Sequence, residues 1–250
     1  MSVLVTGAGS GIGEATARLL AARGNKVAVT DVNEHAAAKV AGETGGLPLQ
    51  LDVTSRESVR AAIATAEKEL GPLDGWVSNA GVSSMISFLD MTDEEWHRLL
   101  TVNLTGVFYC GHEFAHHLVA AGRPGAIVNV ASMAAKQGNV PYLSHYIAAK
   151  FGVVGLTQAM AYELGPYGIR VNSVCPGWVA TSMQERELIW EGELRGITPE
   201  EVKQGFIDNT PLGRIETGDD VARTIAFLLG PDAVFVTGEA LNINGGAFMD

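Results

Sequence analysis

One pair of side chains in this sequence is spaced for proton transfer. Tyr146 and Lys150 lie four residues apart, so a helix places the phenol and the ammonium on the same face. A free phenol has a pKa of about 10, too high for a base near neutral pH, but a neighbouring ammonium favours the phenolate and lowers that pKa. Such a tyrosine can take a proton from an alcohol or give one to a carbonyl. Alone, the same spacing also fits an ordinary pair on a helix.

A glycine-rich segment near the start of the chain has the form of a phosphate-binding turn. Residues 6–13 read TGAGSGIG and lie between a short apolar stretch and a run with helical spacing. Glycines let the backbone turn sharply and approach a pyrophosphate, and the following helix offers free N–H groups and the positive end of its dipole. The position of this segment between the first strand and the first helix therefore predicts a dinucleotide site.

Asp31 indicates which dinucleotide binds there. It closes the second predicted strand, where a carboxylate can accept hydrogen bonds from the adenosine ribose hydroxyls and would repel a 2′-phosphate. No Arg or Lys lies in residues 10–13 or directly after Asp31 to receive such a phosphate. The sequence therefore predicts NAD rather than NADP as the cofactor. In the alternative interpretation, Asp31 only caps the helix that starts near Asn33.

The elements that must position these groups alternate along the chain. Short apolar stretches have the composition of buried strands at 3–6, 26–30, 47–51, 75–78, 125–130, 169–174 and 240–243. Helical apolar spacing lies between them at 13–23, 33–43, 55–70, 93–118, 146–164 and 219–229. This order predicts the α/β class, as one single-domain Rossmann-type doubly wound parallel sheet with helices on both faces.

One region breaks that alternation. Residues 182–214 are rich in charged side chains and have little strand pattern, so we expect a substrate-loop insertion of one or two short helices. A long insertion after a strand is often a lid over a binding site. A solvated helical pair with no such role is the alternative.

Composition and charge narrow the class of protein. The 250 residues are 47% hydrophobic, enough for one packed core, and the formal net charge of -11 disfavours binding to nucleic acid or to an anionic membrane. We expect no membrane span and no signal peptide. Cys110 and Cys175 match no CxxC pattern and lie in apolar runs, so we expect buried, reduced thiols and a cytoplasmic location.

A second motif points to a different chemistry. Residues 112–116 read HEFAH and match the HExxH pattern, in which two histidines on one helix face bind zinc. Catalytic zinc needs a third protein ligand, but residues 115–161 contain no Asp or Glu, and Val119 stands where the longer zinc pattern has Gly. We therefore expect no metal site here, but a histidine cluster at the surface or in an interface.

Several motifs occur together in the order and spacing of one family. They are the glycines Gly7, Gly11 and Gly13, the segment Ser78-Asn79-Ala80-Gly81, Ser132, the Tyr146 and Lys150 pair, and Pro176-Gly177. With them the sequence resembles the classical short-chain dehydrogenase/reductase family over essentially its whole length. Two details depart from the family pattern: Ser78 replaces the first Asn of Asn-Asn-Ala-Gly, and the loop at 133–145 is one residue longer than is most common.

The resemblance implies catalytic roles. Tyr146 is expected to be the general acid/base, and Lys150 to lower its pKa and hold the nicotinamide ribose. Ser132 is expected to bind the substrate oxygen as charge develops on it, and Asn103 to anchor a water that relays protons from Lys150. His145, next to Tyr146, is a further candidate to face the substrate.

The resemblance also implies a set of cofactor contacts. Asp52 is expected to contact adenine through its carboxylate and Val53 through its backbone. The complete expected cofactor-binding set is Gly7, Ser10, Gly11, Ile12, Gly13, Asp31, Asp52, Val53, Asn79, Ala80, Gly81, Tyr146, Lys150, Pro176, Gly177, Val179 and Thr181.

Three functions are compatible with these features. The first is an NAD-dependent dehydrogenase that moves a hydride between NAD and a secondary alcohol or ketone, with sugar alcohols (polyols) among the candidates. The second is a 3-oxoacyl-thioester (acyl-carrier-protein) reductase, a class that usually prefers NADPH and a basic docking face, which Asp31 and the negative net charge argue against. The third is a non-catalytic dinucleotide-binding protein, since fold does not fix function.

The resemblance implies one kind of protein partner. Members of the family are commonly homo-oligomers, so we expect a tetramer or a dimer. In the family layout the helix that carries residues 112–116 lies in a subunit interface.

Overall fold

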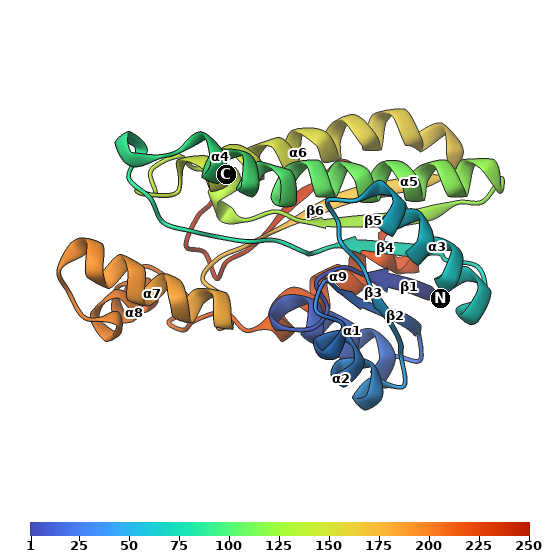
Figure 1. Ribbon diagram of the computed structural model, residues 1–250, viewed down its shortest axis with the longest axis horizontal. Coiled ribbons are helices and arrows are strands. Elements are labelled where there is room, and N and C mark those ends of the chain that lie inside the picture. The colour runs from blue at the N-terminus through green and yellow to red at the C-terminus, as the bar shows by residue number, and fades with distance from the viewer.

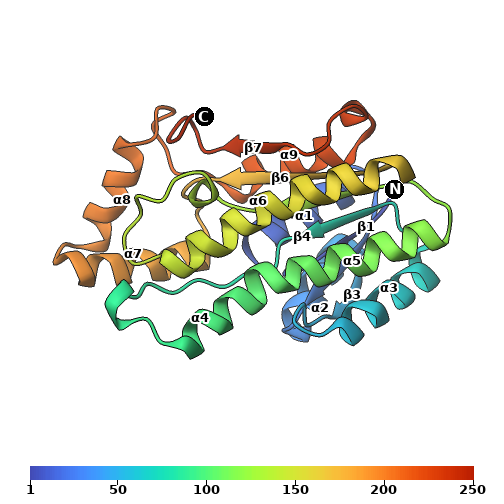
Figure 2. The same cartoon turned by 90° about the horizontal axis from the view of Figure 1, so that it is seen from above.

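The computed structural model describes residues 1–250 and is built around one parallel sheet (Figures 1 and 2). Its strands stand in the spatial order β3-β2-β1-β4-β5-β6-β7, and every neighbouring pair is parallel. The strands are β1 (Ser2–Val5), β2 (Lys26–Asp31), β3 (Leu47–Gln50), β4 (Gly75–Ser78), β5 (Gly125–Val130), β6 (Ile169–Pro176) and β7 (Ala240–Ile243). The strand order reverses between β1 and β4, the point where a crevice opens at the carboxyl ends of the strands in folds of this kind.

Helices cover both faces of the sheet, as Figure 1 shows. One face carries α1 (Gly11–Ala22), α2 (Glu34–Thr44) and α9 (Gly218–Leu229). The other carries α3 (Arg56–Leu70), α5 (Gly106–Ala120) and α6 (Ser144–Leu164), with α4 (Asp93–Leu100) preceding α5. The predicted Rossmann-type doubly wound α/β fold is confirmed.

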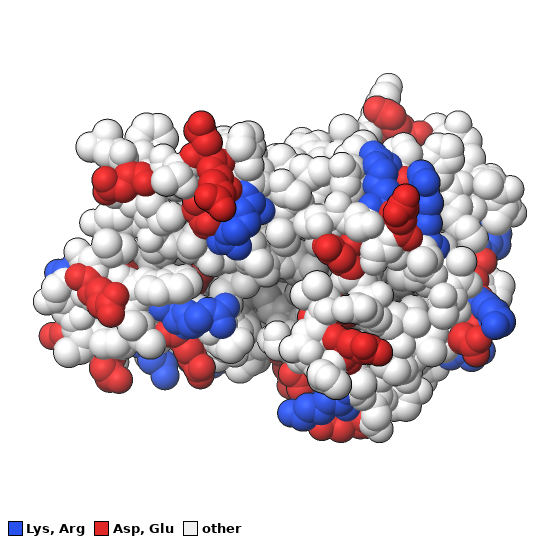
Figure 3. All heavy atoms as spheres, viewed as in Figure 1, with Lys and Arg blue, Asp and Glu red and all other residues white.

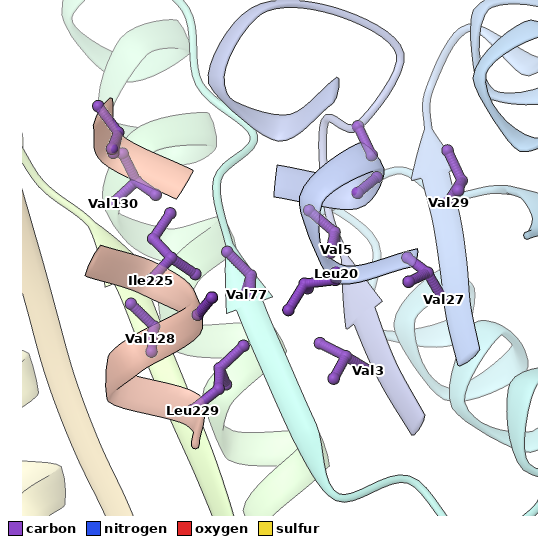
Figure 4. Packing of buried hydrophobic residues seen from close by; sticks show 14 of the residues in the cluster. Val3, Val5, Leu20, Val27, Val29, Val77, Val128, Val130, Ile225 and Leu229 are labelled. Carbon is purple, nitrogen blue, oxygen red and sulfur yellow. The ribbon is translucent and has the colours of Figure 1, made fainter. Parts of the chain in front are cut away.

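The central strands β1, β4 and β5 are buried on both sides, so their alternate residues supply two separate cores. On the α1 side, Val3, Val5 and Val77 pack with Leu20 and Ile225, as Figure 4 shows. On the α5 side lies a second core, whose fully buried members include Leu4, Trp76, Ile127 and Phe114. Burial of a side chain of this size stabilises the fold by about 1.5–3 kcal/mol, and this burial holds the strand ends that form the site.

The helical region predicted at residues 93–118 contains an interruption. Helix α4 ends at Leu100, a π-helical turn covers Thr101–Thr105, and α5 begins at Gly106. Periodicity in the sequence did not reveal this turn, because a single wide turn leaves the apolar spacing on either side almost unchanged. Such π-turns are frequent at functional sites, and this one contains Asn103.

The insertion after β6 consists of two helices, as expected. Helices α7 (Ser182–Arg195) and α8 (Pro199–Asp208) form a helical arm (residues 182–208), seen at the left of Figure 1. The two segments that flank the arm lie side by side, because Val179 and Glu216 pair as an isolated parallel bridge. The chain therefore enters and leaves the arm at neighbouring positions beyond the end of β6.

Two smaller expectations concern the whole chain. Cys110 and Cys175 are free and buried, as predicted. None of the helices combines the length and the apolar character needed to span a membrane.

Candidate active site

A cleft of about 480 Å³ opens at the carboxyl ends of the strands. The space-filling view is hollowed between the helical arm and the body of the molecule (Figure 3). All the predicted site residues line this cleft except Gly13 and Asn103. The fold therefore brings into one place residues that lie as far apart in the sequence as Gly7 and Thr181.

The glycine turn packs directly against the end of β4. Asn79 donates from Nδ2 to the carbonyl oxygens of Thr6 (2.9 Å) and Gly7 (3.0 Å). A Cβ added at Gly13 would lie 2.3 Å from the Gly7 carbonyl oxygen and 2.4 Å from Asn79 Nδ2. Gly13 thus acts by allowing this close approach of α1 to the turn, and not by lining the cleft.

The first turn of α1 is open to an anion. Ser10 occupies the N-cap position, but its side chain makes no capping hydrogen bond, so the N–H groups of the first turn lack a side-chain acceptor. Ser10, Gly11 and Ile12 all line the cleft. A helix N-terminus of this kind fits a pyrophosphate group.

Asp31 holds the glycine turn as well as lining the cleft. Its Oδ2 accepts from the backbone N–H of Gly9 (3.0 Å) and its Oδ1 from that of Asn33 (2.9 Å). The N-cap of α2 is Asn33, whose side chain accepts from Ala36, so the interpretation of Asp31 as the cap is wrong. Each carboxylate oxygen keeps a further acceptor site for ribose hydroxyls.

The neighbouring strand end supplies Asp52 and Val53. Both line the cleft beside Asp31. Asp52 Oδ1 accepts from the backbone N–H (2.9 Å) and hydroxyl (2.7 Å) of Thr54, which fixes the turn after β3. The adenine contacts expected of these two residues stay a prediction.

Tyr146 and Lys150 meet at the start of α6. Both line the cleft, and Lys150 Nζ lies 5.6 Å from the centre of the Tyr146 ring. Lys150 Nζ donates to the Val130 carbonyl oxygen at the end of β5 (2.8 Å), which fixes the ammonium against the sheet. Ser132, which follows the same strand, also lines the cleft, and its hydroxyl lowers the pKa of Tyr146. The three side chains therefore converge on one point.

Burial controls the ionisation of this group. It raises the pKa of Tyr146 above the usual value, the charge of Glu187 raises it further, and the Ser132 hydroxyl opposes the shift. Burial also lowers the pKa of Lys150 to about 8. The phenol shift is opposite to the one expected from the sequence, because loss of hydration on burial is its largest cause.

Asn103 is fully buried behind the cleft. Its Oδ1 accepts from the backbone N–H of Val82 (2.8 Å) and its Nδ2 donates to the carbonyl of the same residue (2.7 Å). The side chain therefore holds the segment after β4 in place, and Val82 lines the cleft. The water relay expected of Asn103 stays a prediction.

The expectation that His145 faces the substrate is wrong. Its side chain is completely buried, and Nε2 lies 2.9 Å from Ser84 Oγ and 3.7 Å from a carboxylate oxygen of Glu95. In the loop before it, Tyr142 is the one non-glycine residue with a positive φ (64°). The Tyr142 carbonyl accepts from the backbone N–H of Ile86 (2.9 Å), which anchors the loop.

The substrate end is lined partly by residues that were missed from the sequence, namely Met133, Ala134, Val140, Leu143 and Trp178. The expected substrate-loop insertion contributes Ser182, Met183, Gln184 and Glu187. The spacing of residues 183, 184 and 187 places them on one face of α7, and this signal was available in the sequence. Trp178 stacks on Phe206 of α8, with ring centres 4.6 Å apart and an interplanar angle of 8°.

The HExxH segment is engaged in ion pairs. Glu113 contacts Arg56 (2.6 Å) and Arg60 (2.7 Å), and these arginines hold the pKa of its carboxyl at about 2. The rings of His112 and His116 lie 5.0 Å apart. No three His, Cys, Asp or Glu side chains of the chain are grouped as metal ligands. The Glu113 carboxylate therefore joins α3 to α5 in this structure.

Comparison with known proteins identifies a matching family model and similar relatives. The family model described as enoyl-(acyl carrier protein) reductase matches residues 7–247. A short-chain dehydrogenase/reductase of Armillaria gallica is 38% identical, over 99% of this chain and 95% of its own. The 3-oxoacyl-[acyl-carrier-protein] reductase FabG of Haemophilus influenzae is 35% identical, over 98% and 97% of the two chains.

Solved structures of similar proteins match this chain over nearly its whole length. The sorbitol-6-phosphate 2-dehydrogenase of Erwinia amylovora is 32% identical with a TM-score of 0.94, and each chain is covered completely. An actinorhodin polyketide ketoreductase, solved with NADPH, is 36% identical with a TM-score of 0.93, over 98% of this chain and 96% of its own.

Proposed function

The chain belongs to the short-chain dehydrogenase/reductase family, whose members are oxidoreductases that bind a nicotinamide dinucleotide, and from that premise we propose an NAD-dependent dehydrogenase of secondary alcohols. The observation that carries the proposal is the convergence of Ser132, Tyr146 and Lys150 beside the glycine turn in one cleft. A non-catalytic protein would have no need for this buried group.

The residues present fit a dinucleotide. The uncapped start of α1 and the glycine turn suit a pyrophosphate, and Asp31 suits a ribose that carries free hydroxyls. Lys150 is the one Lys or Arg among the residues that line the cleft, so no cation stands ready for a 2′-phosphate. This arrangement supports NAD. When bound, the dinucleotide supplies the nicotinamide ring that takes or gives the hydride.

Side chains of the protein then transfer the proton. Tyr146 removes the proton of the substrate hydroxyl, or returns one to a carbonyl in the reverse direction. Ser132 donates a hydrogen bond to the reacting oxygen while charge develops on it. Because burial and the charge of Glu187 raise the pKa of Tyr146, a nearby positive charge must favour the phenolate, and Lys150 is the protein's source of it below a pH of about 8.

Reduction of 3-oxoacyl thioesters is the second candidate. The likeness to FabG favours it, as do the apolar side chains of Met133, Val140, Leu143 and Met183 along the substrate end. Asp31 and the net charge of -11 oppose it, because a phosphopantetheine carrier is itself acidic and such reductases usually use NADPH.

A substrate and cofactor screen tests the proposal. The purified protein is mixed with NAD or NADP and with secondary alcohols, polyols or 3-hydroxyacyl thioesters, and nicotinamide reduction is followed by absorbance. We expect secondary alcohols or polyols to be oxidised with NAD. Preference for NADP, or turnover of the thioesters alone, would overturn the proposal.

A charge-removing variant tests the cofactor assignment. Asp31→Asn keeps an oxygen that can accept from Gly9 but removes the negative charge. The ratio of kcat/KM with NAD to that with NADP should fall at least about tenfold, since hydrogen bonds to a charged group contribute about 1.5–3 kcal/mol. The control is Glu34→Gln, an acidic residue of α2 that does not line the cleft, which should leave the ratio unchanged.

A further inference from the structure

The helix that carries Tyr146 begins without a side-chain cap. Tyr146 is the third residue of α6, whose N-cap position is occupied by Leu143, and no side chain accepts a capping hydrogen bond there. The Ser144 hydroxyl is buried without a partner, so it does not take this role either. The first turn of a helix frays unless other contacts hold it. The position of the phenol therefore depends on contacts that other elements make with the start of α6.

His145 makes such a contact, although it does not line the cleft. Its side chain is completely buried, and Nε2 lies 2.9 Å from Ser84 Oγ. The Ser84 hydroxyl donates to a carboxylate oxygen of Glu95, so the Ser84 oxygen accepts from His145 Nε2. Burial lowers the pKa of His145, in keeping with a neutral ring that carries its one proton on Nε2.

Glu95 fixes the far end of this series of contacts. Arg98 holds its carboxylate with two hydrogen bonds of 2.7 Å, from Nε to Oε2 and from Nη2 to Oε1. The bonds from Arg98 and Ser84 hold the pKa of Glu95 at about 2, so its carboxylate is charged and only accepts. A guanidinium that binds both oxygens of a carboxylate also fixes its orientation. Helix α4, which carries Glu95 and Arg98, packs against α6.

Ser84 lies in a segment that is held at both ends. Asn103 fixes Val82, which lines the cleft, by two hydrogen bonds to its backbone. The backbone N–H of Ile86 donates to the Tyr142 carbonyl oxygen (2.9 Å) just before α6. The start of α6 is thus tied to the same segment that forms part of the cleft wall.

We propose that His145 is a positioning residue that fixes Tyr146 for proton transfer. Ser84 and Glu95 supply the fixed point to which the His145 ring is attached. This inference rests on the proposed dehydrogenase function. A misplacement of about 1 Å can lower the rate of an enzyme by about 10²-fold. His145 should therefore act on kcat, and not on the affinity for the cofactor.

A variant of similar size tests this role. His145→Leu fills the buried space but cannot donate to Ser84, which keeps its own bond to Glu95. With 2-butanol and NAD, kcat should fall about 10–100-fold, while the Kd for NAD should change less than about threefold. The solvent deuterium isotope effect on kcat should rise, because proton transfer over a longer distance becomes the slower step. Partial loss of folded protein would lower kcat without changing this isotope effect.

Further variants locate the effect in the contact between His145 and Ser84. His145→Gln places an N–H near the position of Nε2 and should restore most of the lost kcat. Ser84→Ala should lower kcat as His145→Leu does, and the double variant should lose no more than either single one, because both remove the same contact. Glu94→Gln changes an exposed acid of α4 and should leave kcat unchanged.

Amide hydrogen exchange gives a measurement that needs no turnover. In His145→Leu, peptides that cover residues 144–150 should exchange at least about tenfold faster, because the first turn of α6 is no longer held. Peptides of α5 should exchange as in the wild type. Thermal melting of each variant shows whether the whole fold is affected.

The outcomes distinguish this inference from the proposed function. Unchanged exchange at residues 144–150, an unchanged isotope effect, or losses in the double variant that multiply would each overturn the positioning role of His145 and leave the dehydrogenase function standing. If the wild-type protein oxidises no alcohol with NAD, the proposed function fails, and the proton-transfer role assigned to His145 fails with it.

Discussion

The cofactor end of the cleft is formed by strand ends and a glycine turn that pack on each other, whereas the substrate end is closed by a helical arm whose helices pack mainly on each other. Helix α1 has four buried residues, and its glycine turn leaves no space for a Cβ at Gly13. Helices α7 and α8 have one buried residue each, Gly192 and Val202. The substrate end therefore depends less on the core of the protein.

This difference separates two requirements of the enzyme. The cofactor is the same in every turnover, and a tightly packed end holds it in one geometry. The substrate end must accept a particular substrate, and exposed helix faces can change their side chains with little effect on stability. Substitutions at the two ends should therefore have unequal consequences.

The largest expected effect lies where the two ends meet, at Tyr146. Tyr146→Phe removes the hydroxyl that transfers the proton, so kcat should fall about 10³-fold or more, while NAD affinity changes less than about tenfold. Steady-state kinetics and NAD titration measure the two quantities. Tyr142→Phe is the matched control, because Tyr142 does not line the cleft. Turnover of Tyr146→Phe within tenfold of the wild type would refute the mechanism.

The same substitution should have opposite effects on stability at the two ends. Gly13→Ala forces a Cβ against the backbone of Gly7 and should destabilise the protein by about 3 kcal/mol. Gly205→Ala, in α8, meets no atom within 4 Å and should stabilise it by about 0.5–1 kcal/mol. Urea unfolding of both variants measures the difference. Equal stabilities would show that the two ends are packed alike.

A smaller, pH-dependent effect is expected at Glu216, which connects the two ends. Its Oε2 accepts from the backbone N–H of Gly177 (2.7 Å), and its other carboxylate oxygen is buried without a partner. Burial raises the pKa of Glu216 to about 8, so between about pH 4.5 and 8 the folded protein holds a proton that the unfolded chain has released. This group's contribution to stability is thus complete at low pH and is lost as the pH rises through 8.

The neutral variant Glu216→Gln should remove that pH dependence. It keeps an oxygen for Gly177, and at pH 9 it should be more stable than the wild type by about 2 kcal/mol, with a smaller difference at pH 5. Chemical unfolding at both pH values gives the two differences. A difference that does not grow with pH would show that Glu216 is ionised throughout.

Most of the fold and the cofactor end could be predicted from the sequence, because both depend on local patterns. Apolar stretches marked the strands, and glycines between a strand and a helix marked the phosphate turn. Asp31 was identified because the end of a strand fixes where its side chain lies. Of the predicted catalytic residues, Ser132, Tyr146 and Lys150 do line one cleft.

The remaining features depend on three-dimensional surroundings. Glu185 and Glu187 are alike in the sequence, but only Glu187 lines the cleft. The Lys150 spacing suggested a lowered phenol pKa, while the depth of Tyr146 reverses the shift. The contact of Asn103 with Val82 joins residues separated by the whole of α4, so no short motif reveals it.

The bridge between Val179 and Glu216 has a consequence for protein engineering. Because the chain leaves the sheet and returns to it at neighbouring positions, residues 180–215 can be exchanged as a cassette without changing the length or register of any strand. An arm from a relative, grafted between these two residues, would carry its own substrate preference onto an unaltered sheet.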